Sequence, residues 1–182
     1  MLPVSKTTCL GKAGPSQLGV ESLKVHLLAL GLWIGSVVFF SLVAAPGLFG
    51  AFPRDAAGRA VSAIFPRYYA FGAACGVTAL LSGLLLGARQ GSRGRLLLIE
   101  LAVLALMTGI VLYSGRVVLP QVSEARAALA GAREATASDI AQARFDLLHR
   151  RSVLLNGAVL LLGVVAFALA AARRSPRSVS ET

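Results

Sequence analysis

A single acidic residue interrupts a long apolar segment of this chain and is the first candidate for chemistry. Glu100 lies within residues 96–115, which are otherwise free of charged side chains. It follows Arg95 by five positions, which places it about 7–8 Å into a helix that begins there. An ionisable group at that depth normally faces protein and has a partner, so Glu100 is a functional candidate by default.

His26 is the histidine best placed to be that partner. It follows Lys24 at the start of another apolar segment that runs in the same direction, so its depth is comparable to that of Glu100. Because imidazole exchanges a proton near neutral pH, a His26–Glu100 pair would carry a proton or hold a cation. The alternative is structural: Glu100 reaches back to Arg95 or Arg93 at the membrane surface. Trp33 completes this predicted intramembrane polar site.

A second group of polar residues gathers where the apolar segments end on the opposite side. It comprises Arg67, Tyr68, Tyr69, Tyr113, Arg116, His149, Ser152 and Asn156. Arginine, tyrosine and histidine side chains together bind an anionic headgroup or a small anion. The same residue types are also the usual belt and snorkelling residues at the ends of membrane helices, and both interpretations stay open.

The elements that must position these residues are membrane helices. Of the 182 residues, 56% are hydrophobic and 14% are charged, against roughly a quarter charged in soluble domains. About 20 apolar residues in a helix cross a hydrocarbon core of roughly 30 Å. We predict four spans at about residues 25–45, 68–88, 96–115 and 152–172, which make up a transmembrane domain over 24–172. A polar tail (1–23) precedes it and a basic tail (173–182) follows it.

The fold class predicted is all-α: an integral membrane four-helix bundle with an extramembrane helical hairpin. The hairpin is expected between spans three and four, where residues 116–151 are rich in alanine and in charges of both signs. Pro120 can kink this segment, Gly131 can turn it, and Thr136-x-x-Asp139 resembles a helix-start box. In span one, Pro46-Gly47 and Pro53 are expected to end the helix.

Small residues predict where helices touch. The pairs Gly31/Gly35, Gly72/Gly76 and Gly83/Gly87 each form GxxxG, a spacing that lets helix backbones approach closely in lipid. These faces serve packing within the chain, a homo-oligomer or a protein partner. In span four, His149, Ser152, Asn156 and Gly163 lie on one stripe, which should face protein because isolated polar groups are costly against lipid.

Four sequence phrases carry a resemblance to a known family. They are HLLALGLWIGSVVFFSLVAAPGLF at residues 26–49, FPRYY at 65–69, RVVLP at 116–120 and FDLLHRRSVLLN at 145–156. Together they resemble the transmembrane protein 205-like family, whose bacterial members form a domain of unknown function. The resemblance runs from about residue 24 to 172 and implies a four-span bundle without an established activity or cofactor.

A narrower likeness concerns span one alone. His26, Trp33, Gly35 and Phe39 are similar to the first helix of copper-resistance D-type proteins and of four-helix membrane protoporphyrinogen oxidases, which bind haem. That likeness implies a haem near His26. His26 and His149 cannot ligate the same iron, because spans one and four run antiparallel and place them on opposite sides of the membrane. No metal site is predicted, since histidines and cysteines are too few for the usual zinc ligand sets.

The charge of the chain indicates its surroundings. The net charge is +10, and the basic residues lie between apolar segments, which favours anionic lipid headgroups over nucleic acid. Abundant alanine, arginine and glycine indicate a bacterial protein, and hence a plasma (inner) membrane. The side that holds both termini carries its basic residues in shorter segments, so we predict cytoplasmic termini.

Motifs of known enzymes do not occur in the sequence: it has no phosphate loop, GxSxG or HExxH. The leading prediction is therefore a non-enzymatic membrane protein whose bundle binds or conducts a small solute, lipid or partner. The alternatives are a membrane redox protein with a haem near His26 and a structural subunit of a membrane complex.

Overall fold

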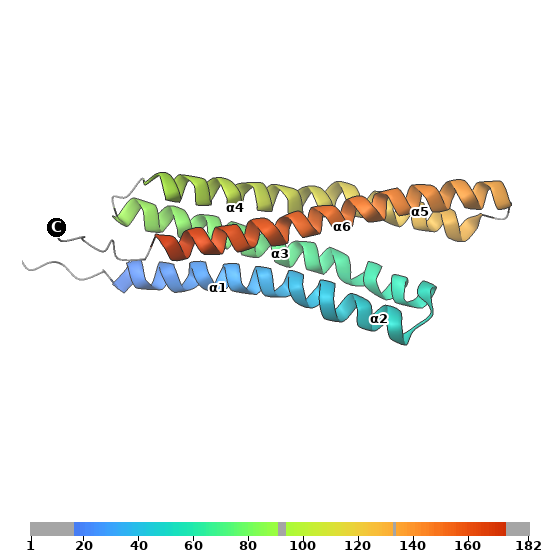
Figure 1. The fold of residues 1–182 in the computed structure, drawn as a ribbon, viewed down its shortest axis with the longest axis horizontal. Helices are drawn as coiled ribbons and strands as arrows, with labels where there is room; N and C mark the ends of the chain where they lie inside the picture. The colour runs from blue at the N-terminus through green and yellow to red at the C-terminus, as the bar shows by residue number, and fades with distance from the viewer. Residues whose placement is uncertain (1–16, 91–93, 133, 174–182) are drawn as a thin grey trace, which may run out of the picture.

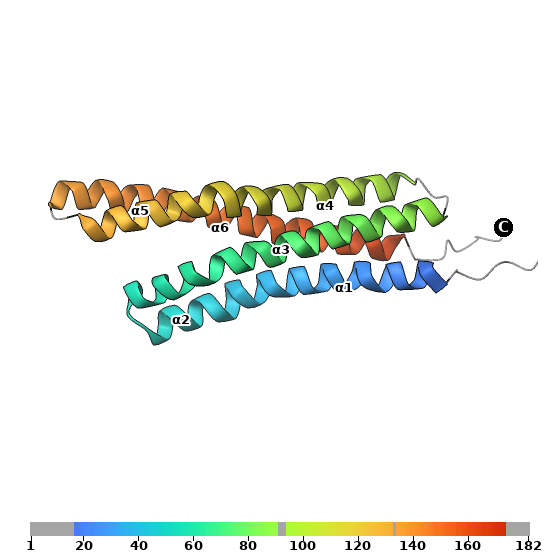
Figure 2. The same cartoon turned by 180° about the vertical axis from the view of Figure 1, so that it is seen from behind.

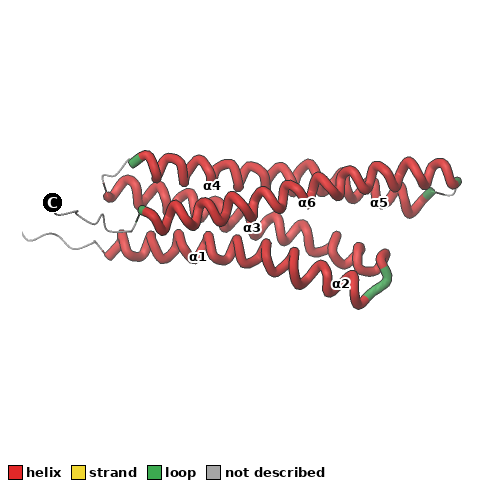
Figure 3. Tube along the Cα trace, in the orientation of Figure 1, coloured by secondary structure: helices red, strands yellow, loops and turns green. Residues whose placement is uncertain are grey.

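The computed structural model describes residues 17–90, 94–132 and 134–173, and almost all of them are helical. The helices form four long rods, α1–η1–α2, α3, α4–η2–α5 and α6, which pack as an antiparallel bundle (Figures 1 and 2). In chain order the elements are α1 (Gln17–Phe39), η1 (Phe40–Ala44), α2 (Ala45–Ala51), α3 (Arg54–Gln90), α4 (Arg95–Tyr113), η2 (Ser114–Val118), α5 (Leu119–Gly131) and α6 (Ala135–Ala172). The described residues contain no strand, and a short loop joins α2 to α3 (Figure 3).

The four rods have the length and composition of membrane-spanning helices, which confirms the predicted all-α membrane bundle. Helix α3 has 37 residues and α6 has 38, so each is about 55 Å long, well beyond a hydrocarbon core of roughly 30 Å. The start of α1 and the end of α6 lie at one end of the bundle. The end of α5 and the start of α6 extend past α2 at the other (Figure 1). This projection is the predicted helical hairpin.

The predicted effect of Pro46 on the first rod was wrong, because the helix continues through it to Ala51. Each π-helical turn ends two residues before a proline, η1 before Pro46 and η2 before Pro120. Proline lacks an N–H, and its ring crowds the carbonyl four residues earlier. A wider turn accommodates the ring without ending the helix, and in lipid an ended helix would leave backbone groups unpaired.

The predicted start of the fourth rod was also wrong in detail. Helix α6 begins at Ala135, and its N-cap residue, Glu134, makes no side-chain capping hydrogen bond. Thr136 therefore lies inside the first turn instead of capping it. The hairpin turn does follow Gly131, where α5 ends.

The bundle has a dry core and an apolar outer surface. Leu30, Trp33, Leu104 and Met107 are at most 1% exposed and fill the centre. On the outside, exposed leucines and valines occur on every rod, and Leu154 is 73% exposed. Apolar side chains at that exposure, over the whole length of the spans, require lipid around them.

Helix α3 uses its glycines to approach its neighbours. A β-carbon at Gly72 or Gly76 would meet the Trp33 side chain at 3.2 and 2.9 Å, and one at Gly83 would meet the His26 ring at 3.4 Å. Gly31 and Gly35 differ: a β-carbon there would have nothing within 4 Å. Of the alternatives predicted for these faces, packing within the chain therefore does not apply to this pair, and its face is open.

Gly76→Ala is expected to destabilise the bundle by about 1–3 kcal/mol, because the added methyl would lie 2.4 Å from the Thr108 hydroxyl. Gly109→Ala is the matched control, since a β-carbon there meets nothing within 4 Å and gains the same helix propensity. Unfolding by SDS can be followed by maleimide labelling of the buried Cys75 in a Cys9→Ser background. Equal stability of the two variants would contradict the close packing.

Candidate functional site

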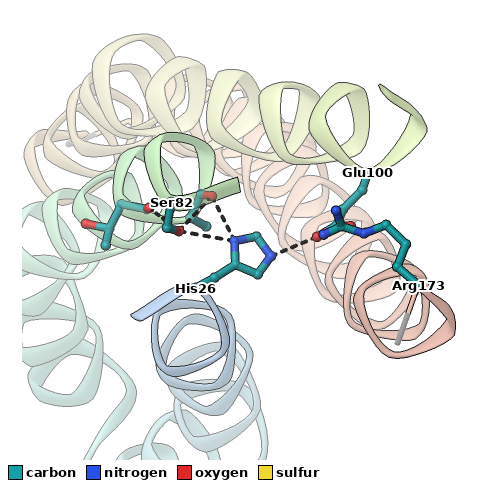
Figure 4. A network of polar contacts seen from close by, with 6 residues as sticks. His26, Ser82, Glu100 and Arg173 are labelled. Atoms are coloured by element: carbon teal, nitrogen blue, oxygen red, sulfur yellow. Dashed lines mark hydrogen bonds and ion pairs between the residues drawn. The ribbon is translucent and has the colours of Figure 1, made fainter. Parts of the chain in front are cut away.

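Three charged or titratable side chains from three rods meet inside the bundle, at the end where α1 begins and α6 ends (Figure 4). His26 comes from α1, Glu100 from α4 and Arg173 from the C-cap of α6. His26 Nε2 lies 2.7 Å from Glu100 Oε1, and Arg173 Nη2 lies 2.5 Å from Glu100 Oε2. His26 and Glu100 are fully buried. We call these three residues the buried triad.

Helix α3 fixes the tautomer of His26. Its Nδ1 lies 3.0 Å from the Ala79 carbonyl oxygen and 3.1 Å from Ser82 Oγ. A carbonyl oxygen can only accept, so Nδ1 carries a proton and donates it. The Ser82 hydroxyl donates to the Thr78 carbonyl at 2.7 Å, which leaves its lone pairs free to accept from the imidazole. With Nδ1 directed at α3, Nε2 is the nitrogen that faces Glu100.

The contact between His26 Nε2 and Glu100 Oε1 needs a proton of its own. Two acceptor atoms 2.7 Å apart would repel each other, because each would present a lone pair. With Nδ1 already protonated, the shared proton makes the pair either imidazolium with carboxylate or imidazole with carboxylic acid. The pair is thus a buried site that holds one proton between two groups.

Arg173 is the partner that the sequence prediction missed. Arg95 is exposed, and among described residues no ion pair joins it to Glu100; Arg93 lies outside the described residues. Arg173 had been assigned to the basic tail, although it follows the fourth span directly at the level of Arg95. Its antiparallel position was the signal that could have placed it near Glu100.

Trp33 does not join the buried triad. It is 1% exposed and packs against Gly72 and Gly76 of α3, deeper in the bundle. Its role in the described structure is to fill the core. Ser82, which the sequence analysis did not single out, contacts His26 instead.

The triad leaves little room for a metal ion or a haem. Arg173 already occupies the position beside Glu100 Oε2 where a cation would bind, and the described residues contain no group of three or more His, Cys, Asp or Glu side chains that could hold a metal. A haem ligand needs one imidazole nitrogen directed at the iron. Both nitrogens of His26 are engaged by protein atoms, so the residues around His26 do not fit a haem.

The second predicted cluster, at the opposite membrane border, divides into residues that hydrogen-bond between helices and residues that are exposed. Tyr68 donates to Asn156 Oδ1 at 2.7 Å, and Asn156 Nδ2 donates to Ser41 Oγ at 3.1 Å. The Tyr69 hydroxyl lies 3.4 Å from Ser152 Oγ. These hydrogen bonds tie α3 and η1 to α6. Ser41 was missed by the sequence analysis, because a lone serine in an apolar span gives no signal of its partner.

Sequence comparison places the chain in a family. A family model described as a domain of unknown function (DUF4149) matches residues 28–131. The chain belongs to this family. No curated protein and no solved structure matches the chain. The match agrees with the predicted membrane domain of unknown function, but it does not establish the transmembrane protein 205 label.

The remaining residues of the second cluster lie on the surface of this family member. Arg67, Arg116 and His149 are exposed, and His149 stacks on Phe145 of its own helix, with ring centroids 5.9 Å apart. Of the predicted stripe on α6, Ser152 and Asn156 face neighbouring helices but His149 does not. Tyr113 accepts a hydrogen bond from Arg151, a residue that the prediction had left out.

Proposed function

We propose that this chain is a non-enzymatic multi-pass membrane protein that binds one exchangeable proton at the buried triad. The observation that carries the proposal is the 2.7 Å contact between His26 Nε2 and Glu100 Oε1, beside an Nδ1 already committed to the Ala79 carbonyl. Ionisable groups buried in membrane bundles commonly mark proton relays or ligand sites. The proton links α1 to α4, and Arg173 extends the link to the end of α6.

Binding of the proton fits the packing better than conduction across the bundle. Leu30, Trp33, Leu104 and Met107 are buried side by side between the triad and the Tyr68–Asn156 network. The cavity nearest that core, lined by Trp33 and Tyr68 among others, measures about 10 Å³, the space of at most one water molecule. Loss of the proton would instead weaken the contact between α1 and α4, because His26 Nε2 and Glu100 Oε1 would each present a lone pair.

The proton would serve the binding or movement of a small solute, a lipid or a partner. In the orientation we propose, the protein lies in a bacterial plasma membrane with both termini in the cytoplasm, so the triad lies near the cytoplasmic border. A structural role in a complex is the second candidate. The open face at Gly31 and Gly35 favours it, because such faces suit contact with a second helix.

Nitrogen NMR can test the proton directly, because the chain contains two histidines, His26 and His149. In protein labelled with ¹⁵N-histidine and carrying His149→Gln, every imidazole signal comes from His26. We expect a protonated Nδ1 and a strongly deshielded proton shared by Nε2 and Glu100, which disappears in D₂O and in Glu100→Leu. An unprotonated Nδ1, or no such proton in lipid nanodiscs at neutral pH, would remove the basis of the proposal.

A further inference from the structure

Positive charge on the hairpin side of the bundle is not balanced by acidic side chains. Among described residues, the ion pairs Lys24–Glu21, His26–Glu100 and Arg173–Glu100 all lie near the end where α1 begins and α6 ends. At the opposite border, four exposed arginines make no ion pair with any described residue: Arg67, Arg116, Arg150 and Arg151. The guanidinium groups at this border are therefore open to anions from outside the chain.

One of these arginines is held in place by a neighbouring rod. Arg151 of α6 donates from Nη2 to the Tyr113 hydroxyl of α4 at 2.5 Å, and its guanidinium carbon lies 5.4 Å from the centre of the tyrosine ring. A guanidinium has five N–H donors, so four remain after this bond. Because Tyr113 restricts the side chain, less entropy is lost when a ligand binds to it.

The surroundings of Arg151 match a phospholipid. Arg151 precedes the uncharged residues 152–172, and Arg116 follows Tyr113 by three positions on the other rod. Directly inside this border, Leu112, Val153 and Leu154 are 37%, 56% and 73% exposed. A guanidinium binds phosphate oxygens through paired charge-assisted hydrogen bonds, while the exposed leucines and valine offer a surface for acyl chains. Free phosphate would use the first feature and not the second.

We propose that Arg151, oriented by Tyr113 and assisted by Arg116, binds the phosphate of an anionic phospholipid at the hairpin-side border. This site lies at the opposite membrane border from the buried triad and does not depend on the proposed proton. Specificity comes from position. The guanidinium binds the phosphate of the headgroup, while the apolar side chains on the membrane side of it contact the acyl chains of the same lipid.

Native mass spectrometry of protein released from nanodiscs can test this proposal. The discs contain equal amounts of phosphatidylglycerol, which is anionic, and phosphatidylcholine, which is zwitterionic. We expect retained phosphatidylglycerol to exceed phosphatidylcholine, and Arg151→Gln to reduce that preference about tenfold, the loss of about one charge-assisted hydrogen bond. Tyr113→Phe should reduce it severalfold without changing the net charge.

Arg144→Gln is the matched control, because Arg144 is exposed on α6 about 10 Å beyond Arg151. It should leave the preference unchanged. An equal loss in Arg144→Gln and Arg151→Gln would show general charge attraction and overturn the site. Displacement of the lipid by millimolar inorganic phosphate would overturn the lipid assignment in favour of a small-anion site. An unchanged preference in Arg151→Gln and Tyr113→Phe would also overturn it.

Discussion

Glu100→Leu is expected to lower the free energy of unfolding by about 3 kcal/mol. Removal of one partner of a buried ion pair leaves the other charge uncompensated, which costs about 3–5 kcal/mol in general. The lower figure applies because the Arg173 side chain is 17% exposed and can turn toward the headgroups. The fluorescence of Trp33, the single tryptophan, would report unfolding during an SDS titration.

The double variant Glu100→Leu/Arg173→Met distinguishes the cost of an uncompensated charge from the cost of altered packing. Apolar residues of similar volume often replace a buried ion pair without cost, so the double variant should recover at least half of the lost stability. Glu21→Leu is the control, because the Lys24–Glu21 pair is exposed and such pairs contribute about 0–1 kcal/mol. If Glu100→Leu lowered the free energy of unfolding as little as Glu21→Leu does, the stabilising role of the triad would be contradicted.

The same substitution tests whether the triad attaches the end of α6. Without Glu100, Arg173 has no acidic partner among the described residues. Hydrogen exchange in the last turn of α6 should therefore become faster in Glu100→Leu, while exchange in the α5–α6 hairpin stays unchanged. Unaltered protection of the last turn would contradict the proposed attachment of α6 through Glu100.

The fold and two of the three triad residues could be predicted, because both follow from the length and spacing of segments along the sequence. Charge-free stretches of sufficient length predict spans. The constant rise of a helix places His26 and Glu100 at similar depths, and the structure brings them into contact. The same rule places Arg173 at the depth of Arg95, but it does not show that Arg173 contacts Glu100. Its contact depends on which rods are neighbours, and the position of α6 beside α4 is a property of the assembled bundle.

The direction of side chains around each rod was the other quantity that the sequence did not determine. His149 and Asn156 are two turns apart on α6, yet one is exposed and the other contacts α3 and η1. The His149 ring points away from the neighbouring rods and stacks on Phe145 of its own helix, whereas the Asn156 side chain points toward α3 and η1. Likewise, the GxxxG pattern is equal at Gly31 and Gly72, but only Gly72 has a neighbouring rod close to it.

Trp33→Ala is expected to cost about 3–5 kcal/mol, the usual range for removing a large buried aromatic side chain. Trp33 is 1% exposed and lies against Gly72 and Gly76. In lipid the loss arises from missing van der Waals contacts, since the apolar solvent supplies no hydrophobic force between helices. Because this variant lacks the fluorophore, maleimide labelling of Cys75 in SDS provides the measurement.

Two companion variants separate packing by Trp33 from a role in the buried triad. Trp33→Phe should keep most of the stability and leave the shared His26–Glu100 proton signal unchanged, because Trp33 touches neither group. Gly76→Ala should cost less in Trp33→Ala than in the native chain, since its added methyl would no longer approach the indole at 2.9 Å; contacting residues couple by about 0.5–3 kcal/mol. Strict additivity, or loss of the proton signal in Trp33→Phe, would contradict a packing role and return Trp33 to the intramembrane site predicted from the sequence.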